Sequence, residues 1–292
     1  MNGAPPPARG PVRELGKFLE IQNLGLNLPF AVAFLLAAAN GLPALWTVVL
    51  IVVAFVAARN AGHSFNRWAD RALDALNPRT QDRALVTGRY SPAFALGLTA
   101  AWSALLFVAA FLLNPLALLL APVALLLLFG YSYSKRVTAF TTVLLGLVEG
   151  ITPAAAYIAV TGTLPRSALV AVGAILLWGT AFETIHSLGD LEVDRRLGLR
   201  SIPVALGAER SVALVPVLHA AALVLLAGYV VVAGLGPVPL VAVAGMAVLV
   251  GVADVIVYKR PSAPRLPFQL HFAMGVLFLV GVVLALFVPG WR

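Results

Sequence analysis

The stretch PALWTVVLIVVAFVAARNAGHSFNRWADRALD, residues 43–74, joins a long apolar run to a polar end. The apolar part, residues 43–65, is long enough to cross a bilayer as a helix, which takes about 20 mainly apolar residues. Asn66, Asp70 and Asp74 follow at four-residue spacing, and a continuing helix places them on one side. Carboxylates at this spacing repel each other unless a cation lies between them, and Mg²⁺ suits such oxygen ligands. We interpret the stretch as a membrane-spanning helix whose end carries a candidate Mg²⁺ site.

A second acidic pair, Asp190 and Asp194, repeats this spacing after another apolar run. The chain has only 12 Asp and Glu residues, so two matched pairs are a concentrated signal. A basic loop follows each pair, with Arg79 and Arg83 after the first and Arg195, Arg196 and Arg200 after the second. The two halves therefore resemble a diverged internal repeat. Facing pairs of this kind can share metal ions, and the arginines can hold a multidentate anion such as diphosphate.

The composition is that of an all-α polytopic membrane protein. Hydrophobic residues make up 61% of the chain and charged residues only 11%, with a mean hydropathy of +0.97. Backbone groups in lipid must be satisfied within the segment, which favours helices. The absence of cysteine excludes a disulfide framework, a thiol nucleophile and a zinc–thiolate site. The isoelectric point near 10.4 is explained by loop arginines, so we expect a lipid bilayer and no nucleic acid as partner.

Breakers such as Asn40-Gly41-Leu42-Pro43 and Asn114-Pro115 separate the apolar runs. We predict nine membrane-spanning helices, at about residues 19–39, 43–65, 91–113, 115–132, 138–160, 165–188, 210–233, 237–257 and 267–289. Residues 1–16 are expected to form a disordered cytoplasmic tail and residues 17–292 a single domain.

Lysine and arginine are distributed very unevenly around these spans. If the N-terminus lies in the cytoplasm, 18 of the 20 Lys and Arg residues fall in cytoplasmic segments or the span ends beside them. Only Arg166 and Arg292 fall on the opposite side. The positive-inside rule predicts such an asymmetry. We therefore expect an N-in, C-out topology with both acidic pairs at the cytoplasmic face.

Several motifs, taken in order, resemble those of the UbiA superfamily of intramembrane prenyltransferases. The family's N-D-x-x-D-x-x-x-D motif is matched by Asn66, Asp70 and Asp74, and its D-x-x-x-D motif by Asp190 and Asp194. Three further family segments are matched by Arg79-Thr80…Arg83…Gly88, Tyr131-Ser132-Tyr133-Ser134-Lys135-Arg136 and Gly198…Ser201-Ile202-Pro203. The resemblance covers about residues 17–290.

The chain also departs from the family pattern. Arg67 stands where many members have Asp, and Glu183 and His186 replace the Asp and Tyr of the D-x-x-Y-x-x-x-D segment that leads to Asp190. Glu183 keeps a carboxylate, whereas the role of His186 stays open. The segments Asn66-Arg67-x-x-Asp70 and Asn77-Pro78-Arg79-Thr80 resemble those of the 4-hydroxybenzoate polyprenyltransferase-like branch. This branch includes the enzyme of the futalosine route to menaquinone.

The resemblance implies a UbiA-like helical bundle in the cell (inner) membrane, with a central cavity that opens to the cytoplasmic side. It also implies a Mg²⁺-dependent enzyme that transfers a polyprenyl group from polyprenyl diphosphate to an aromatic acceptor. The favoured acceptor is 4-hydroxybenzoate or a related aromatic acid of ubiquinone or menaquinone biosynthesis. In such a reaction, metal and basic side chains neutralise the leaving diphosphate, and a dry cavity protects the allylic cation.

The resemblance further implies roles for individual residues. The catalytic carboxylates and Mg²⁺ ligands are Asp70, Asp74, Asp190 and Asp194, with Asn66 assisting. Diphosphate oxygens are bound by Arg79, Arg83, Lys135 and Arg136. Arg59, two helical turns before Asn66, is expected with Asn66 near the aromatic acceptor, and Glu183 and His186 are candidate cavity residues.

Other functions fit parts of the same pattern. Within the family, the acceptor could instead be dihydroxynaphthoate, a haem vinyl group, a chlorophyllide or a glyceryl phosphate. A transporter for an anionic solute would use the same arginines and carboxylates, but it gives no reason for two carboxylate pairs on one face. A structural subunit without activity would not need all four aspartates.

Two titratable groups away from these motifs fall within predicted spans. His219 is expected to make an interhelical hydrogen bond, and Asp254 could pair with Lys259 or Arg260.

Overall fold

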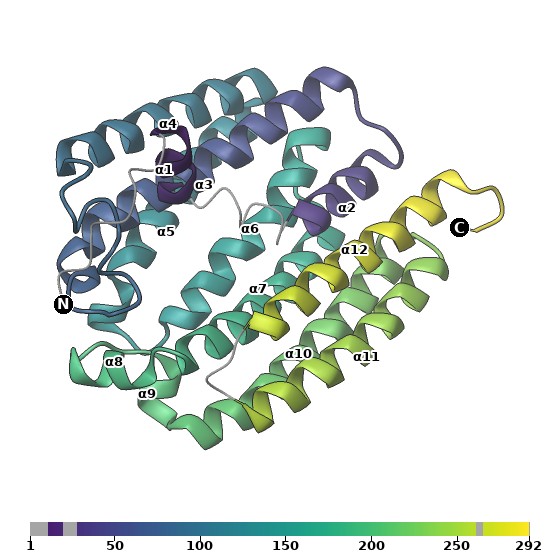
Figure 1. Cartoon of the computed structure of the whole chain (residues 1–292). Coiled ribbons are helices and arrows are strands. Elements are labelled where there is room, and N and C mark those ends of the chain that lie inside the picture. The colour runs from purple at the N-terminus through teal and green to yellow at the C-terminus, as the bar shows by residue number, and fades with distance from the viewer. Residues whose placement is uncertain (1–10, 20–27, 261–264, 292) are drawn as a thin grey trace.

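The computed structural model describes residues 11–19, 28–260 and 265–291. Within these residues the chain forms twelve helices, α1 to α12, and no β-strand (Figure 1). The predicted all-helical architecture is therefore confirmed.

Eight of the helices are long and apolar enough to cross a membrane. They are α3 (Leu45–Asp74), α4 (Pro92–Leu113), α5 (Pro115–Val137), α6 (Thr141–Thr161), α7 (Arg166–Leu188), α10 (Ala208–Val232), α11 (Val238–Lys259) and α12 (Arg265–Phe287). Two short helices, α8 (Leu191–Arg196) and α9 (Ile202–Leu206), connect α7 to α10. The polytopic membrane character predicted from composition follows from this set of helices.

The first predicted span differs from the rest. Its described part is α2 (Leu28–Ala39), an apolar helix of 12 residues, which is shorter than a bilayer crossing requires. Residues 20–27 of that span lie outside the described residues. The count of nine spans and the N-in, C-out orientation therefore stay predictions.

Part of the predicted disordered tail is helical. The helix α1 (Pro11–Phe18) includes residues 11–16, whereas residues 1–10 lie outside the described chain. Phe18 and Leu19 are buried against a cluster that includes Leu85 and Tyr90. Glu14 forms an ion pair with Arg89. These contacts lie about 70 residues away in sequence, which explains why local composition indicated a free tail.

The predicted breakers mark helix boundaries. Asn114 separates α4 from α5, and its side chain accepts a hydrogen bond from the Ala117 amide at 2.9 Å as the N-cap of α5. Pro115 follows at the first helical position, where its missing N–H costs nothing. The Asn114 side-chain amide also donates to the Ile158 carbonyl at 2.8 Å, which ties this turn to α6.

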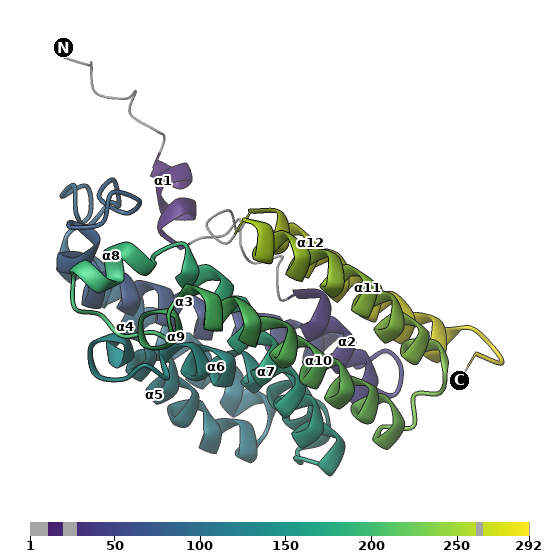
Figure 2. The same ribbon diagram turned by 90° about the horizontal axis from the view of Figure 1, so that it is seen from below.

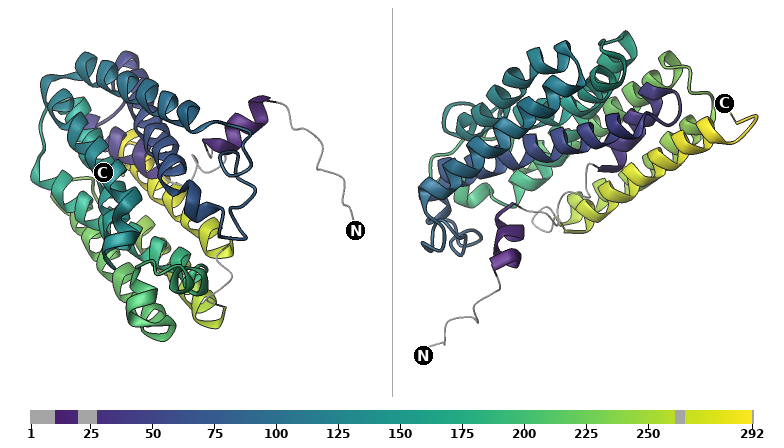
Figure 3. Two further views of the ribbon diagram at one scale, coloured as in Figure 1. Left: turned by 90° about the vertical axis from the view of Figure 1, so that its left-hand side faces the viewer. Right: turned by 90° about the horizontal axis from the view of Figure 1, so that it is seen from above.

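The helices pack as neighbours around α6 and α7, which share the most extensive helix contact in the described bundle. Gly146 and Gly150, which are four residues apart, lie at this contact. A Cβ at Gly146 would lie 2.3 Å from the Leu176 carbonyl oxygen, and one at Gly150 would lie 3.1 Å from that of Val172. Glycine therefore allows the two backbones to approach this closely. Figures 2 and 3 show α3, α4 and α5 on one side of this pair and α10, α11 and α12 on the other.

The helix α3 is much longer than a bilayer core is thick. Its 30 residues span about 45 Å at about 1.5 Å per residue, against about 30 Å of hydrocarbon. Its last turns, which carry Asn66, Asp70 and Asp74, therefore project past the apolar part. The ends of α5 and α7 and the short helices α8 and α9 lie at the same end of the bundle (Figures 1 and 2).

Candidate active site

A cavity of about 180 Å³ lies where α3, α5 and α7 end. Nearly all the residues selected from the sequence motifs line it. They are Asn66, Asp70, Asp74, Arg79, Arg83, Lys135, Glu183, His186, Asp190 and Asp194. Residues more than 100 positions apart thus face one space, as the two matched motifs predicted.

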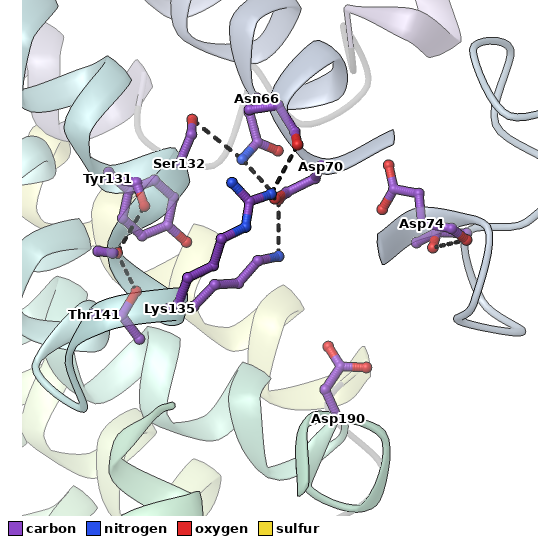
Figure 4. A network of polar contacts seen from close by, with 12 residues as sticks. Asn66, Asp70, Asp74, Tyr131, Ser132, Lys135, Thr141 and Asp190 are labelled. Atoms are coloured by element: carbon purple, nitrogen blue, oxygen red, sulfur yellow. Dashed lines mark hydrogen bonds and ion pairs between the residues drawn. The ribbon is translucent and has the colours of Figure 1, made fainter. Parts of the chain in front are cut away.

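Asp70 is the most heavily bonded carboxylate of the cavity. Its Oδ2 lies 2.8 Å from Lys135 Nζ and 3.1 Å from Asn66 Nδ2, and its Oδ1 lies 2.9 Å from Arg136 Nη2 (Figure 4). The Asn66 amide is also 3.3 Å from Ser132 Oγ. The side chain of Asp70 is only 4% exposed, so its charge is compensated by two cations in a buried setting.

Asp74 lies one turn further along α3 and has its own cation. Arg83 Nη1 is 2.5 Å from its Oδ1, and the Asp74 side chain is 8% exposed. The Thr80 hydroxyl donates to the Asp74 backbone carbonyl at 2.9 Å. This bond folds the loop back over the end of α3 and brings Arg83 to the carboxylate.

The second acidic pair is built differently. α7 ends at Leu188, and Asp190 is the N-cap residue of the separate short helix α8. The Asp194 amide donates to the Asp190 carbonyl at 2.8 Å, so one helical turn still joins the two. The pair therefore keeps the predicted side-by-side placement without being part of a transmembrane helix.

One ion pair connects the two motifs. Arg79 Nη2 lies 2.6 Å from Asp190 Oδ2, between residues 111 positions apart. The Arg79 side chain is 47% exposed, so this pair borders solvent. Asp190 lies across the cavity from Asp70 and Lys135 (Figure 4).

Asp194 titrates unusually among the acids outside the spans. Burial raises the pKa of its carboxyl to about 6, and the neighbouring Asp190 carboxylate adds to the rise. Within the described chain, Asp194 has no hydrogen bond or ion pair through its side chain. Two close carboxylates with one basic partner between them favour a bound proton or a bound cation.

Several polar cavity residues received no role from sequence reasoning. The Tyr131 hydroxyl donates to Glu183 Oε1 at 3.4 Å, and Ser132 accepts from Asn66. Tyr131 precedes Lys135 by one helical turn on α5, so that spacing could have indicated a shared face. Ser201 also lines the cavity, as does Arg200 of the second basic loop, which the sequence indicates as a candidate anion ligand. The Arg200 amide donates to the Lys135 carbonyl at 2.7 Å.

Two selected residues lie outside the lining. Arg136 reaches the cavity indirectly, through Asp70 and through the Ala69 carbonyl 2.7 Å from its Nη2. Arg59 donates from Nη1 to the Leu19 carbonyl at 2.9 Å. Sequence reasoning expected Arg59 near an aromatic acceptor, and the structure places it at the end of α1.

The residues present fit a hard divalent cation. No three His, Asp or Glu side chains in the described ranges come close enough to hold a metal by themselves. Mg²⁺ does not need this, because it usually takes one or two carboxylates together with substrate phosphates and water. Among the described residues, Asp190 Oδ1 is buried without a hydrogen-bond partner, and Asp194 lies one helical turn further on. The donor set is thus suitable, with unused carboxylate capacity at the second pair.

A comparison with protein families matches residues 27–277 to the UbiA prenyltransferase family. A Shewanella woodyi protein named 4-hydroxybenzoate octaprenyltransferase is 31% identical over 273 residues, which cover 89% of this chain and 93% of that protein. A Saccharophagus degradans protein of the same name is 34% identical over 170 residues. That match spans 58% of this chain and 57% of the relative's length.

Solved structures share the fold. A UbiA homologue from Aeropyrum pernix superposes with a TM-score of 0.82 at 33% identity, covering 90% of this chain and 98% of that one. A UbiA homologue from Archaeoglobus fulgidus, bound to DMAPP and Mg²⁺, gives a TM-score of 0.76 at 21% identity. It covers 94% of this chain and 99% of the homologue.

Proposed function

Since this chain belongs to the UbiA prenyltransferase family, we propose that it transfers a polyprenyl group from polyprenyl diphosphate to an aromatic acceptor in a Mg²⁺-dependent reaction. The favoured acceptor is 4-hydroxybenzoate or a related aromatic acid of ubiquinone or menaquinone biosynthesis, as the names of the relatives suggest. The observation that carries the proposal is the meeting of both acidic pairs and their basic partners in one cavity.

The proposed cation ligands are Asp70, Asp74, Asp190 and Asp194, with Asn66 assisting. When bound, Mg²⁺ supplies positive charge that stabilises the leaving diphosphate. The Archaeoglobus homologue bound to DMAPP and Mg²⁺ supports a role for this metal, and the choice of ligand residues rests on the cavity of this chain. Among the described cavity residues, Asp190 offers a buried carboxylate oxygen, Oδ1, without a hydrogen-bond partner, so this atom is available to such an ion.

The proposed diphosphate ligands are Arg79, Arg83, Lys135 and Arg136. Each lies 2.5–2.9 Å from a cavity carboxylate, so each can turn to a phosphate oxygen that arrives beside it. The allylic C–O bond then breaks, and its electron pair leaves with the diphosphate. Fixed cations aimed at this developing charge lower the barrier, which is usually the largest catalytic term.

The acceptor ring then attacks the allylic cation. A ring carbon forms the new C–C bond and loses its proton, which restores aromaticity. Arg59 stays the proposed partner of the acceptor carboxylate, although it now bonds the Leu19 carbonyl. Tyr131 and Glu183 join α5 to α7 and line this space.

The test is an assay of membranes containing the protein with labelled polyprenyl diphosphate and 4-hydroxybenzoate, with and without Mg²⁺. We expect a prenylated aromatic product only with the metal. The acceptor assignment would change if the prenyl group is transferred instead to dihydroxynaphthoate, haem, a chlorophyllide or a glyceryl phosphate. Absence of any transfer from a folded preparation would overturn the proposal and favour anion transport.

We also propose that the cavity faces the cytoplasm of the cell (inner) membrane in an N-in, C-out topology. The concentration of Lys and Arg at the cavity end supports this. The chain has no cysteine, so single cysteines can report the topology. We expect an impermeant maleimide to label Leu42→Cys, at the opposite end, in intact cells, and to label Leu76→Cys only after the membrane is opened. The reverse pattern would invert the topology. Both leucines are exposed.

A further inference from the structure

The two acidic pairs of the cavity carry different numbers of basic partners. Asp70 contacts Lys135 and Arg136, and Asp74 contacts Arg83, so two carboxylates face three cations. Asp190 contacts Arg79, and Asp194 contacts no cation among the described residues, so two carboxylates face one. With ordinary charges, the first group carries a net charge of +1 and the second of −1.

Burial strengthens this difference. The side chains of Asp70 and Asp74 are 4% and 8% exposed, so their ion pairs are poorly screened. Both Asp70 oxygens already have partners within 3.1 Å. Asp190 and Arg79 are 16% and 47% exposed, and one Asp190 oxygen has no hydrogen-bond partner. A divalent cation that approaches Asp70 would therefore meet two positive side chains. One that approaches Asp190 would meet a carboxylate oxygen without a hydrogen-bond partner.

We propose that the cavity loads in a fixed order: a divalent cation binds Asp190 and Asp194 first, and Asp70 and Asp74 take a cation only together with a diphosphate. This proposal rests on the proposed function of the same site. The diphosphate acts as the exchange partner for Lys135, Arg136 and Arg83. As these side chains turn to its oxygens, the first pair loses its cations and becomes net negative.

The ion pairs of Asp70 and Asp74 stabilise the protein before a metal ion and a diphosphate bind. Two buried carboxylates without partners would repel each other and lose hydration. The three cations stabilise them until the anion arrives, and the long Lys and Arg side chains can then turn without backbone movement. The second pair has one basic partner, Arg79, and leaves Asp190 Oδ1 without a hydrogen-bond partner, so less positive charge opposes a cation there.

The test counts Mn²⁺ bound to the full-length protein in detergent by equilibrium dialysis, with total Mn²⁺ and phosphate measured on both sides. Inorganic pyrophosphate serves as the diphosphate probe. We expect one tightly held Mn²⁺ without pyrophosphate and at least one more with it. Asp190→Asn should lose the first ion, with its affinity falling at least tenfold. Asp70→Asn should keep the first ion and lose the pyrophosphate-dependent one.

A double variant gives a gain of binding that misfolding cannot imitate. Lys135→Gln with Arg136→Gln removes two cations beside Asp70, so we expect a second Mn²⁺ to bind without pyrophosphate. Glu192→Gln is the matched control, because Glu192 is exposed on α8 between the two aspartates and does not line the cavity. It should leave both stoichiometries unchanged.

Two outcomes would overturn the order: loss of the pyrophosphate-independent ion in Asp70→Asn but not in Asp190→Asn, or equal binding at both pairs without pyrophosphate. If either result is found while the wild-type preparation transfers prenyl groups, the binding order is rejected and the proposed function stays intact. A preparation that binds in this order but transfers no prenyl group would instead reject the proposed function alone.

Discussion

This bundle contains two separate groups of titratable side chains, and they differ in the types of residue that form them. The cavity cluster consists of the two aspartate pairs with Arg79, Arg83, Lys135 and Arg136. It lies at the helix ends, and all its members except Arg136 line a space of about 180 Å³. The histidine cluster consists of His219, Asp254 and His271 with Trp178 and Phe182, and it lies between α7, α10, α11 and α12.

The histidine cluster is packed tightly and lacks long flexible cations. His219 is completely buried, and its Nδ1 lies 2.8 Å from Asp254 Oδ1. Its ring centroid is 5.4 Å from those of Trp178 and His271. Short, ring-bearing side chains in a packed site have few alternative rotamers. The comparison teaches that long side chains at a cavity suit exchange of partners, whereas short ones inside the bundle suit a fixed link between helices.

The largest expected effect comes from the cavity cluster. Asp70→Asn and Asp190→Asn should each lower the rate of prenyl transfer by about 10²- to 10³-fold, the size typical of a lost electrostatic contact to the transition state. Measurement of kcat in membranes, with heat stability followed in parallel, checks this. Glu192→Gln, an exposed change on α8, should keep full activity. Normal turnover in both aspartate variants would show that the cavity cluster is not the metal site.

The histidine cluster should respond in the opposite way. His219→Ala removes the partner of Asp254 and should cost about 1–3 kcal/mol of stability through an unsatisfied buried group, while the folded fraction keeps its kcat. The midpoint of heat-induced aggregation, read by size exclusion, measures the loss. Val217→Ala on the exposed face of α10 is the control and should change neither quantity. A kcat loss without a stability loss would place the two clusters in one functional unit.

The α6–α7 contact should sharpen the comparison, because α7 carries Trp178 and Phe182 of the histidine cluster and leads directly to Asp190 and Asp194 of the cavity cluster. Gly146→Ala puts a Cβ 2.3 Å from the Leu176 carbonyl oxygen, and such overpacking costs about 1–3 kcal/mol. We expect lower heat stability together with a smaller, several-fold loss of kcat. Gly97→Ala, where no atom lies within 4 Å of the new Cβ, should be neutral. Equal behaviour of the two variants would show that α7 is not held by this contact.

The smallest expected effect is a pH dependence at Asp194. Its pKa of about 6 lies above the value of about 3.9 expected in an unfolded chain. The folded metal-free protein therefore binds the extra proton between about pH 4 and 6 and loses stability as the pH rises through that window. A cation needs the ionised form, so Mn²⁺ affinity should fall as the pH drops below about 6.

Heat stability between pH 5 and 8, with EDTA or with Mn²⁺, measures both trends. Asp194→Asn should flatten the metal-free curve in the lower part of this range. An unchanged curve in that variant would assign the titration to another group.

The fold could be predicted to a large extent because its signals are local. Apolar runs of sufficient length gave the positions of α3 to α7 and α10 to α12, and Asn114 with Pro115 marked a boundary that the structure keeps. The exceptions depend on contacts that are distant in sequence. The helix α1 is stabilised against Tyr90, and Asp254 pairs with His219 rather than with Lys259 or Arg260. Five or six positions along a helix do not bring Asp254 to either cation.

The members of the candidate site could be predicted better than their partners. Repeated i, i+4 aspartates with basic loops identified the cavity residues, because the chain has few charges and they gather at one end. Spacing carries no information on which cation bonds which acid, so the Arg79–Asp190 pair and the double contact of Asp70 emerged only from the structure. Arg59 shows the same limit, since its position on the helix did not indicate the Leu19 carbonyl.

The length of α3 also makes the site responsive to the bilayer. Asp70 and Asp74 lie on a rigid extension of a membrane-spanning helix, whereas Asp190 and Asp194 lie on a short helix beyond the end of α7. A helix adapts to a thinner or thicker bilayer by changing its tilt, and the extension of α3 would move the first pair with it. Lipid chain length would thereby change the distance that a substrate must bridge between the two acidic pairs. The thickness of the host membrane would then affect the rate of prenyl transfer.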